Sequence, residues 1–343
     1  MRAEPFEGYP HVLSTKQFTL DDVRRIKSLA AAIRSRPEKF ADALHRRRAQ
    51  VAFKGESTRT FNSSYWAAYD LGAKVVGNQA MGIMSSDAKG ESFPDTIRTL
   101  ARLNLDYLFL RWSHEGAASE AVYYLEEQAK KRGKRNTCSV INSGDGPGEH
   151  PTQALLDLTT ILDHFPDTTK QIVVAIIGDL KRGRTTHSLT YLLAKNFPNI
   201  SFFLLSPEEA MMKSGVIEYL DEHRRHFCQV TRPNFYAIAS GVDVWYVTRP
   251  QLNLEDDPDT RARMIKEYQP FIFQPEIVPE LKAGSIIMHP LPRTFELPDD
   301  PAIMDYPGFV PFDQVENGYW IRMALLVMIE NAKINLFAES QEV

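Results

Sequence analysis

The stretch that most constrains the fold is Ile172–Ile177, an unbroken run of aliphatic residues. A short, continuous apolar run rich in β-branched residues is typical of a strand covered on both faces, as in parallel sheets sandwiched by helices. Comparable strands are expected at 51–53, 74–76, 107–110, 202–205, 244–247 and 285–288. Helical patterns separate them, so the alternation predicts an α/β fold with parallel sheets.

The helical segments have recognisable ends. Thr19 and Asp22 form a capping signature in front of apolar residues at helical spacing, which predicts an amphipathic helix that ends before Pro37. Further helices are expected at 62–71, 95–103 and 187–195, and a long apolar helix at 319–329.

The length of the chain predicts two domains. A chain of 343 residues, 43% of them hydrophobic, exceeds the size at which a single core stops growing. We expect two doubly wound parallel-sheet domains with a cleft between them, covering residues 1–150 and 151–318. Residues 319–343 are expected to form a C-terminal helix that packs back on the first domain.

The composition excludes several classes of partner. With 40 basic and 44 acidic residues the formal charge is −4, whereas a nucleic-acid or anionic-membrane protein would be basic. The basic run at 130–135 is interpreted as a solvated helix end. No stretch approaches the ~20 apolar residues of a membrane span. Two cysteines, Cys138 and Cys228, are too few for a disulfide framework or zinc site, so we expect a cytoplasmic protein in which both are buried or inert.

A cluster of hydroxyls and a cation follows the first strand. Ser57, Thr58, Arg59 and Thr60 come after Val51-Ala52-Phe53 and precede a helix. A helix N-terminus has unpaired N–H groups and a positive dipole end, and an arginine fork adds two parallel donors, so the segment predicts an oxyanion site suited to phosphate. The alternative is a simple Ser/Thr helix cap, which needs one hydroxyl and no arginine.

Two further polar groups occur at ends of elements. Arg111 closes the strand at 107–110, at the carboxyl edge where open α/β sheets bind ligands. His150 stands at the junction of the halves with Gln153 one helical turn along, so both could point into a cleft and the imidazole could polarise a carbonyl. The alternative for His150 is a helix cap with satisfied polar groups.

The second half contains a near match to a nucleotide loop. Residues 178–185 have the glycine spacing of a P-loop, but Arg184 occupies the lysine position, which argues against nucleotide binding. Arg184 and Arg249 follow neighbouring strands, with Gln251 two residues on, and two guanidiniums at one sheet edge predict a dicarboxylate ligand. The alternative is that each arginine snorkels or pairs with a surface acid.

The chemistry implied is direct group transfer. No serine, cysteine or acid forms a convincing nucleophile with a base, and no His/Asp/Glu cluster has metal-ligand spacing, so no metal or cofactor is expected. Catalysis would rest on orienting two bound substrates and stabilising charge.

In combination, these motifs resemble the catalytic chain of the aspartate carbamoyltransferases. The resemblance extends from about Val12 to Leu336. It rests on the segments 57–60, 89–91, 150–157, 178–181, 183–185, 248–249 and 289–293, together with Arg111. Ornithine carbamoyltransferases share the first motif but have a cysteine-containing segment in place of 289–293, which favours aspartate as the acceptor.

The resemblance implies transfer of a carbamoyl group from carbamoyl phosphate to L-aspartate, a step of pyrimidine biosynthesis. It also implies a homotrimer whose active sites are shared between neighbouring chains. Ser57, Thr58, Arg59, Thr60 and Arg111 would hold the phosphate and carbonyl oxygens, and Ser85 and Lys89 would reach in from the adjacent subunit. His150 would contact the carbonyl oxygen, Gln153 the carbamoyl nitrogen, and the backbone carbonyls of Pro290 and Leu291 the reacting amines. Arg184, Arg249 and Gln251, with Lys89, would bind aspartate.

Several positions depart from the family pattern. Gly55 replaces a glutamate before the Ser-Thr-Arg-Thr segment, and Leu252-Asn253-Leu254 replaces a Lys-Glu-Arg run after Gln251. We expect the ion pairs that orient Arg184 and Arg249 to be absent or rebuilt with Glu56 or Glu255. Two alternatives follow: a carbamoyltransferase with another amino-acid acceptor, and a non-catalytic trimeric relative. A regulatory chain is left open.

Overall fold

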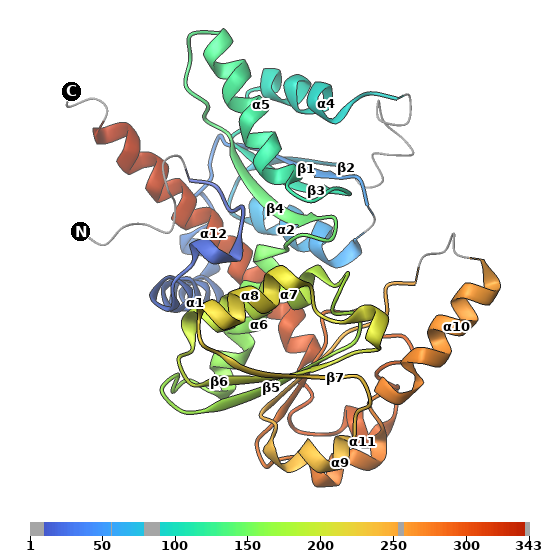
Figure 1. The fold of residues 1–343 in the computed structure, drawn as a ribbon. Coiled ribbons are helices and arrows are strands. Elements are labelled where there is room, and N and C mark those ends of the chain that lie inside the picture. Colours follow the sequence, from blue (N-terminus) through green and yellow to red (C-terminus); the bar gives the residue numbers. More distant parts are fainter. Residues whose placement is uncertain (1–9, 56, 79–89, 253–256, 340–343) are drawn as a thin grey trace. The chain divides into compact units, whose positions relative to one another are not determined.

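The structure is a computed structural model that describes residues 10–55, 57–78, 90–252 and 257–339 (Figure 1). Two compact units are present, one formed by Met1–Leu156 with Val315–Val343 and the other by Asp157–Gln314. The chain therefore divides a few residues away from the boundaries expected at 150 and 318.

The first unit contains a four-stranded parallel sheet in the order β2-β1-β3-β4. The strands are β1 (Arg48–Phe53), β2 (Lys74–Asn78), β3 (Tyr107–Trp112) and β4 (Ser139–Asp145). The described helices are α1 (Leu20–Ser35), α2 (Thr58–Asp70), α4 (Phe93–Leu100), α5 (Ala117–Lys131), the start of α6 (Pro151–His164) and most of α12 (Pro311–Glu339).

The second unit contains a five-stranded parallel sheet in the order β7-β6-β5-β8-β9. The strands are β5 (Ile172–Ile177), β6 (Ile200–Leu205), β7 (His226–Val230), β8 (Val244–Val247) and β9 (Ile286–Met288). The helices are α7 (Arg184–Asn196), α8 (Ser214–Glu222), α9 (Phe235–Ile238), α10 (Pro258–Tyr268) and α11 (Pro301–Met304). The predicted α/β class with two parallel sheets is confirmed.

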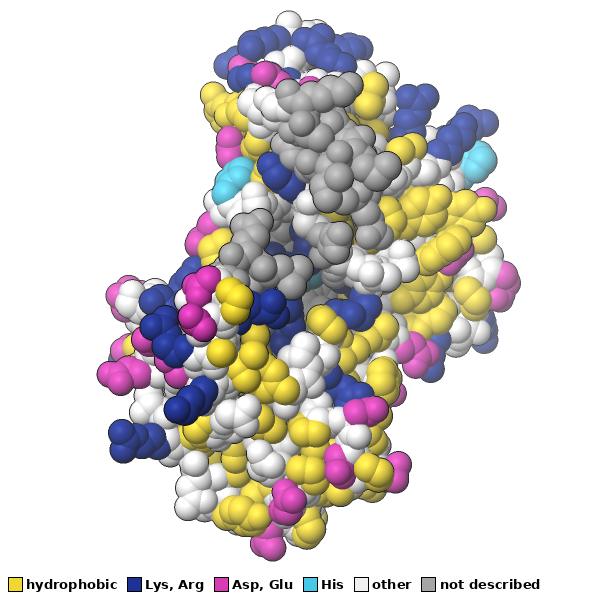
Figure 2. Space-filling model, turned by 90° about the vertical axis from the view of Figure 1, so that its right-hand side faces the viewer, with side chains coloured by type: hydrophobic (Ala, Val, Ile, Leu, Met, Phe, Trp, Pro, Cys, Tyr) yellow, Lys and Arg dark blue, Asp and Glu magenta, His cyan; other side chains and the backbone are white. Residues whose placement is uncertain are grey.

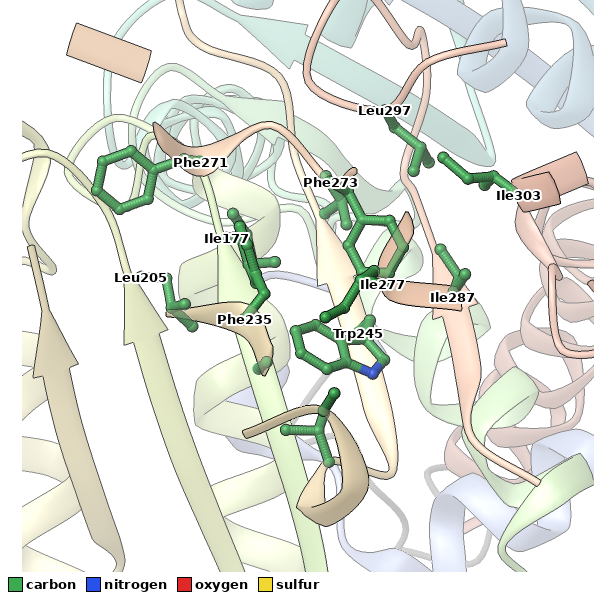
Figure 3. Close-up of a cluster of buried hydrophobic side chains, with 14 residues drawn as sticks. Ile177, Leu205, Phe235, Trp245, Phe271, Phe273, Ile277, Ile287, Leu297 and Ile303 are labelled. Carbon is green, nitrogen blue, oxygen red and sulfur yellow. The ribbon is translucent and has the colours of Figure 1, made fainter. Parts of the chain in front are cut away.

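The core of the second unit shows why the apolar runs form these strands. Trp245 of β8 lies fully buried against Phe273, with ring centroids 5.4 Å apart in an edge-to-face arrangement (Figure 3). Ile177 of β5 and Ile287 of β9 belong to the same cluster. Large aromatic rings contribute much of the burial energy of such a core.

The C-terminal helix packs on the first unit, as expected. In α12, Glu330 accepts a hydrogen bond from Arg47 Nε at 2.9 Å and another from the hydroxyl of Tyr107. Lys333 donates to the backbone oxygen of Asp106 at 2.8 Å, and burial lowers the pKa of this lysine to about 8. Buried polar groups thus tie α12 to the amino-terminal edge of the sheet.

The basic run at 130–135 is confirmed as a solvated helix end. Lys130, Lys131, Arg132, Lys134 and Arg135 are exposed at the end of α5, where dark blue side chains gather at the top of Figure 2. Cations at the carboxyl end of a helix face the negative end of its dipole.

The two cysteines differ in exposure. Cys138 is buried, and burial raises the pKa of its thiol to about 12, so it is unreactive. Cys228 is exposed because β7 is an edge strand in which the side chains of His226 and Gln229 interrupt the apolar pattern.

Candidate active site

The turn between β1 and α2 carries the first polar cluster. Helix α2 begins at Thr58, four residues before the expected start at Asn62, so Thr58, Arg59 and Thr60 lie in its first turn. Ser57 occupies the N-cap position, and its side chain makes no capping hydrogen bond. The hydroxyl is therefore not used as a helix cap, and the N–H groups of the first turn face outward at the positive end of the helix dipole.

Arg111 lies beside this turn. It pairs with Phe53 in the register of β3 and β1, and its guanidinium donates to the backbone oxygen of Ser143 at 3.4 Å. A Cβ added at Gly55 would lie 3.9 Å from Arg111 Nε, so the backbone at Gly55 passes close to the guanidinium. Parallel pairing thus brings the cation of one strand end to the hydroxyl cluster of the next, as expected for the carboxyl edge.

His150 joins the same cluster. Its side chain is buried, and Nε2 lies 3.4 Å from the hydroxyl oxygen of Thr60. Its Nδ1 lies 3.4 Å from the hydroxyl oxygen of Thr152. The backbone oxygen of His150 accepts from Gln153 N–H at 3.0 Å as α6 begins, so Gln153 stands in the first turn of that helix. The first unit therefore brings the side chains of Thr60 and His150 together, with Gln153 in the first turn of the helix that follows His150.

The turn before His150 is anchored by two acids that the sequence interpretation missed. Asp145 accepts hydrogen bonds from the N–H groups of Glu149 at 2.7 Å and Gly116 at 3.0 Å. Glu149 in turn accepts from the hydroxyl of Ser14 at 2.6 Å and the N–H of Thr15 at 2.8 Å. Burial raises the pKa of Asp145 despite these N–H bonds. Ser14 and Thr15 are more than 130 positions from Glu149 in the chain, so no local pattern indicates these contacts.

In the second unit, Arg184 and Arg249 follow neighbouring strands. Ile177 of β5 pairs with Val247 of β8, so the two carboxyl ends are adjacent. Arg184 is the first residue of α7, and Arg249 comes two residues after β8; both are half-buried. Gly178 has φ 129°, and a Cβ there would lie 2.3 Å from the oxygen of Thr248, so only glycine allows this approach.

A buried carboxylate connects the two turns. Asp179 accepts from the backbone N–H of Arg182 at 3.0 Å and pairs with its guanidinium at 2.9 Å. It also accepts from the backbone N–H of Gln251 at 3.4 Å. Asp179 therefore fixes the segment that carries Arg249 and Gln251 relative to the turn that carries Arg184. The Glu56 or Glu255 replacement expected from the sequence lies outside the described residues.

The segment 289–293 is held by its own histidine. Nδ1 of His289 accepts from the backbone N–H of Leu291 at 2.8 Å, and Nε2 donates to Glu296 at 2.9 Å. Leu291 adopts φ 58°, a left-handed conformation that a branched side chain rarely takes. These bonds fix the peptide units at Pro290 and Leu291, whose backbone carbonyls are the predicted ligand-binding groups.

A buried network of hydrogen-bonded side chains holds the backbone of His289 in place. Its backbone N–H donates to Gln314 at 2.7 Å, Gln314 donates to Asp157 at 2.7 Å, and the hydroxyl of Tyr246 donates to the other oxygen of Asp157 at 2.7 Å. Burial, followed by the charge of Asp157, raises the pKa of Tyr246 well above its usual value, so the hydroxyl remains a donor. Of these supporting residues only Asp157 belongs to a motif recognised in the sequence, the segment 150–157.

Two predicted residues, Ser85 and Lys89, lie outside the described residues. Within the described ranges no group of three or more metal-binding side chains gathers. No described helix is long and apolar enough to cross a membrane.

The fold and the two clusters define an α/β protein of two parallel-sheet units, each with arginine and polar side chains at the carboxyl edge of its sheet. Residues 10–163 match the family described as aspartate/ornithine carbamoyltransferase, carbamoyl-P binding domain. Residues 170–329 match the Asp/Orn binding domain of the same family. The chain belongs to the aspartate/ornithine carbamoyltransferase family.

Individual relatives agree with this placement. The chain is 34% identical to the aspartate carbamoyltransferase catalytic subunit of Methanocella arvoryzae over 94% of its own length and 98% of that protein. It is also 34% identical to the multifunctional protein pyr1-3 of Dictyostelium discoideum, of which it spans only 14%. Among solved structures, aspartate transcarbamoylase from Trypanosoma cruzi with N-(phosphonacetyl)-L-aspartic acid matches at 31% identity and a TM-score of 0.81, covering 94% of this chain and 96% of that one.

Proposed function

We propose that this chain transfers the carbamoyl group of carbamoyl phosphate to the amine of L-aspartate, giving N-carbamoyl-L-aspartate and phosphate in pyrimidine biosynthesis. The observation that carries the proposal is the cluster at the carboxyl edge of the first sheet, where Arg59, Arg111, Thr60 and His150 stand beside the N-terminus of α2. The matching Trypanosoma cruzi enzyme was solved with carbamoyl phosphate and aspartate, and also with carbamoyl aspartate and phosphate.

The first unit supplies the groups for carbamoyl phosphate. Ser57, Thr58 and Thr60, the N–H groups of α2 and the guanidinium of Arg59 bind the phosphate oxygens. Arg111 and His150 stabilise the charge that develops on the carbonyl oxygen as the amine attacks. Gln153, in the first turn of α6, accepts a hydrogen bond from the carbamoyl NH2 group with its side-chain oxygen.

The second unit supplies the groups for the acceptor. Arg184, Arg249 and Gln251 bind the two carboxylates of aspartate, held by the turns that Asp179 connects. The backbone carbonyls of Pro290 and Leu291 accept hydrogen bonds from the amine and fix its approach. The amine nitrogen forms the new bond to the carbonyl carbon, the carbon–oxygen bond to phosphate breaks, and the amine proton leaves with the phosphate.

We further propose a homotrimer with shared active sites, in which Ser85 and Lys89 of one chain serve its neighbour. An exposed aromatic patch supports the assembly. Trp66 and Tyr69 of α2 are 50% and 54% exposed, and both rings contact the ring of Tyr65. Val76, in the edge strand β2, is 63% exposed. Patches of this kind on a sheet edge mark protein interfaces.

The patch gives a direct test of assembly. Trp66→Glu is expected to convert the trimer to monomers, because it places a charge at the centre of a desolvated contact. Sedimentation velocity measures the change, with Tyr123→Glu on the exposed face of α5 as a matched control that stays trimeric. A Trp66→Glu trimer, or a wild-type monomer, contradicts the proposed interface.

The acceptor is tested by phosphate release. The protein is supplied with carbamoyl phosphate and one of a panel of amino acids that includes aspartate and ornithine, and we expect release to depend on aspartate. The departure at Leu252 directly follows Gln251 of the acceptor groups, so it favours one second candidate, a different amino-acid acceptor. Release with another amino acid and not with aspartate would establish that candidate.

We also propose a cytoplasmic location. It is supported by two free thiols, of which one is buried and one exposed.

A further inference from the structure

A buried arginine of the C-terminal helix lies behind the His150 cluster. Arg322 of α12 is 3% exposed. Its Nη1 donates to the backbone oxygen of Gly318 at 2.7 Å, and its Nη2 donates to the hydroxyl oxygen of Thr152 at 3.1 Å. Both Thr152 and Arg322 belong to the first unit. The guanidinium of Arg322 thus bonds the hydroxyl that lies beside His150, and this contact bears on which ring nitrogen of His150 carries the proton.

The direction of each hydrogen bond follows from what the groups can do. A guanidinium only donates, so the oxygen of Thr152 accepts from Arg322. The single hydrogen of the Thr152 hydroxyl is then free for Nδ1 of His150, 3.4 Å away. A neutral imidazole carries one proton, and when Nδ1 accepts, that proton sits on Nε2.

The chain continues to the ligand side. With its proton on Nε2, His150 donates toward the oxygen of Thr60 at 3.4 Å, or toward a ligand oxygen that takes its place. The hydroxyl hydrogen of Thr60 is then left for the ligand. Hydrogen bonds aligned in one direction polarise one another, and here the series starts from a charge that cannot be lost.

We propose that Arg322 is a positioning residue that fixes His150 in the Nε2–H tautomer through Thr152, so that the His150 N–H and the Thr60 O–H both act as donors to the bound substrate. This part of the proposal rests on the proposed function, in which an oxygen of carbamoyl phosphate accepts both hydrogen bonds. Arg322 itself does not touch the substrate. In this arrangement the C-terminal helix sets the protonation pattern of the active site.

The test is nitrogen NMR of the protein labelled with ¹⁵N-histidine at a pH where histidine is neutral. The His150 signals are assigned by their loss in His150→Gln. We expect wild-type His150 to show a protonated Nε2 and an unprotonated Nδ1. Arg322→Met and Thr152→Val should both populate the Nδ1–H form, whereas Thr152→Ser, which keeps the hydroxyl, should retain the wild-type tautomer.

Activity provides the second readout. Loss of groups that orient a functional side chain typically costs about 10- to 100-fold, so kcat should fall by this amount in Arg322→Met and Thr152→Val while Thr152→Ser stays near wild type. Arg225→Met is a matched control, because Arg225 donates to the backbone oxygens of Ala194 and Pro198 at 2.8 and 2.7 Å in the second unit. That variant should lose stability without changing the His150 signals.

The proposal is overturned if His150 of the wild-type protein carries its proton on Nδ1. This measurement does not depend on whether any variant folds. It is also overturned by an unchanged tautomer in folded Arg322→Met and Thr152→Val. The NMR reading does not require turnover. A tautomer change in these variants of a protein that transfers no carbamoyl group would therefore uphold the positioning role and reject the proposed function.

Discussion

The two strand edges that carry the candidate site are built in different ways. At the first edge, the N-terminus of α2 lies beside a series of hydroxyl and imidazole groups. Within this series His150 lies between the hydroxyls of Thr60 and Thr152. At the second edge, half-buried arginines stand on turns that are fixed by buried carboxylates such as Asp179. The first edge therefore combines a helix N-terminus with a series of hydroxyl and imidazole groups, whereas the second presents cations on turns that a buried carboxylate connects.

The largest effect is expected from removing the guanidinium of the first edge. Arg59→Ala should lower kcat/KM for carbamoyl phosphate by about 10³-fold, since the loss of one donor to a developing oxyanion costs about 10²- to 10³-fold and here a charge is lost as well. Arg59→Lys keeps the charge but not the planar fork and should recover only part of the loss. Phosphate release measures both, and normal turnover of Arg59→Ala would refute the phosphate assignment.

A smaller and more selective effect is expected at the second edge. Arg249→Ala should raise KM for aspartate by about 10- to 100-fold, corresponding to a charged hydrogen bond of about 1.5–3 kcal/mol. Carbamoyl phosphate affinity, measured by calorimetry without acceptor, should stay within about twofold. Lys181→Ala serves as the control, because it removes an exposed cation from the turn that leads to Arg184. Equal loss of affinity for both substrates in Arg249→Ala would contradict the division of labour between the edges.

The smallest effect concerns stability and pH. Burial raises the pKa of Glu296, but hydrogen bonds from His289 and Thr294 outweigh it and leave the pKa below the ordinary value of 4.5. A carboxyl whose folded pKa is lowered contributes stability above its unfolded pKa, and this contribution is lost as the pH falls through the folded pKa. Glu296→Gln should therefore be less stable than wild type by about 2 kcal/mol near neutral pH, and the difference should shrink below pH 4.5.

Urea unfolding across this pH range measures the difference. Asp299→Asn is the control, because Asp299 is exposed and its ion pair with Arg293 should add little. A difference between wild type and Glu296→Gln that grows toward low pH would show that Glu296 is not held as an ionised acceptor.

Much of the fold could be predicted from the sequence because the unbroken apolar runs of the second unit form largely buried strands. The strands at 172–177 and 244–247 have the predicted bounds, and those at 202–205 and 285–288 differ by one or two residues at the start. Strands β4 and β7 were missed. Serines, an asparagine and an aspartate interrupt β4, and β7 lies at an edge with little apolar surface to bury.

The positions of the candidate site residues in the fold were predictable in part. Residues next to strand ends, such as Arg111 and Arg249, follow from topology alone, because parallel strands gather their carboxyl ends. The groups that support the two histidines of the candidate site cannot be predicted in this way. Arg322, Glu149 and Gln314 come from helices or turns far along the chain, and tertiary packing alone brings them to Thr152, Thr15 and His289.

The central claim is that the first edge binds carbamoyl phosphate and the second edge delivers the amine that receives the carbamoyl group. It is tested most directly by incubating the wild-type protein with ¹³C-carbamoyl phosphate and L-aspartate and identifying the labelled product by NMR. We predict N-carbamoyl-L-aspartate carrying the label, with one phosphate released per product and none formed by Arg59→Ala. Consumption of the label only by hydrolysis, or tight binding of carbamoyl phosphate with no labelled ureido product, would contradict the account.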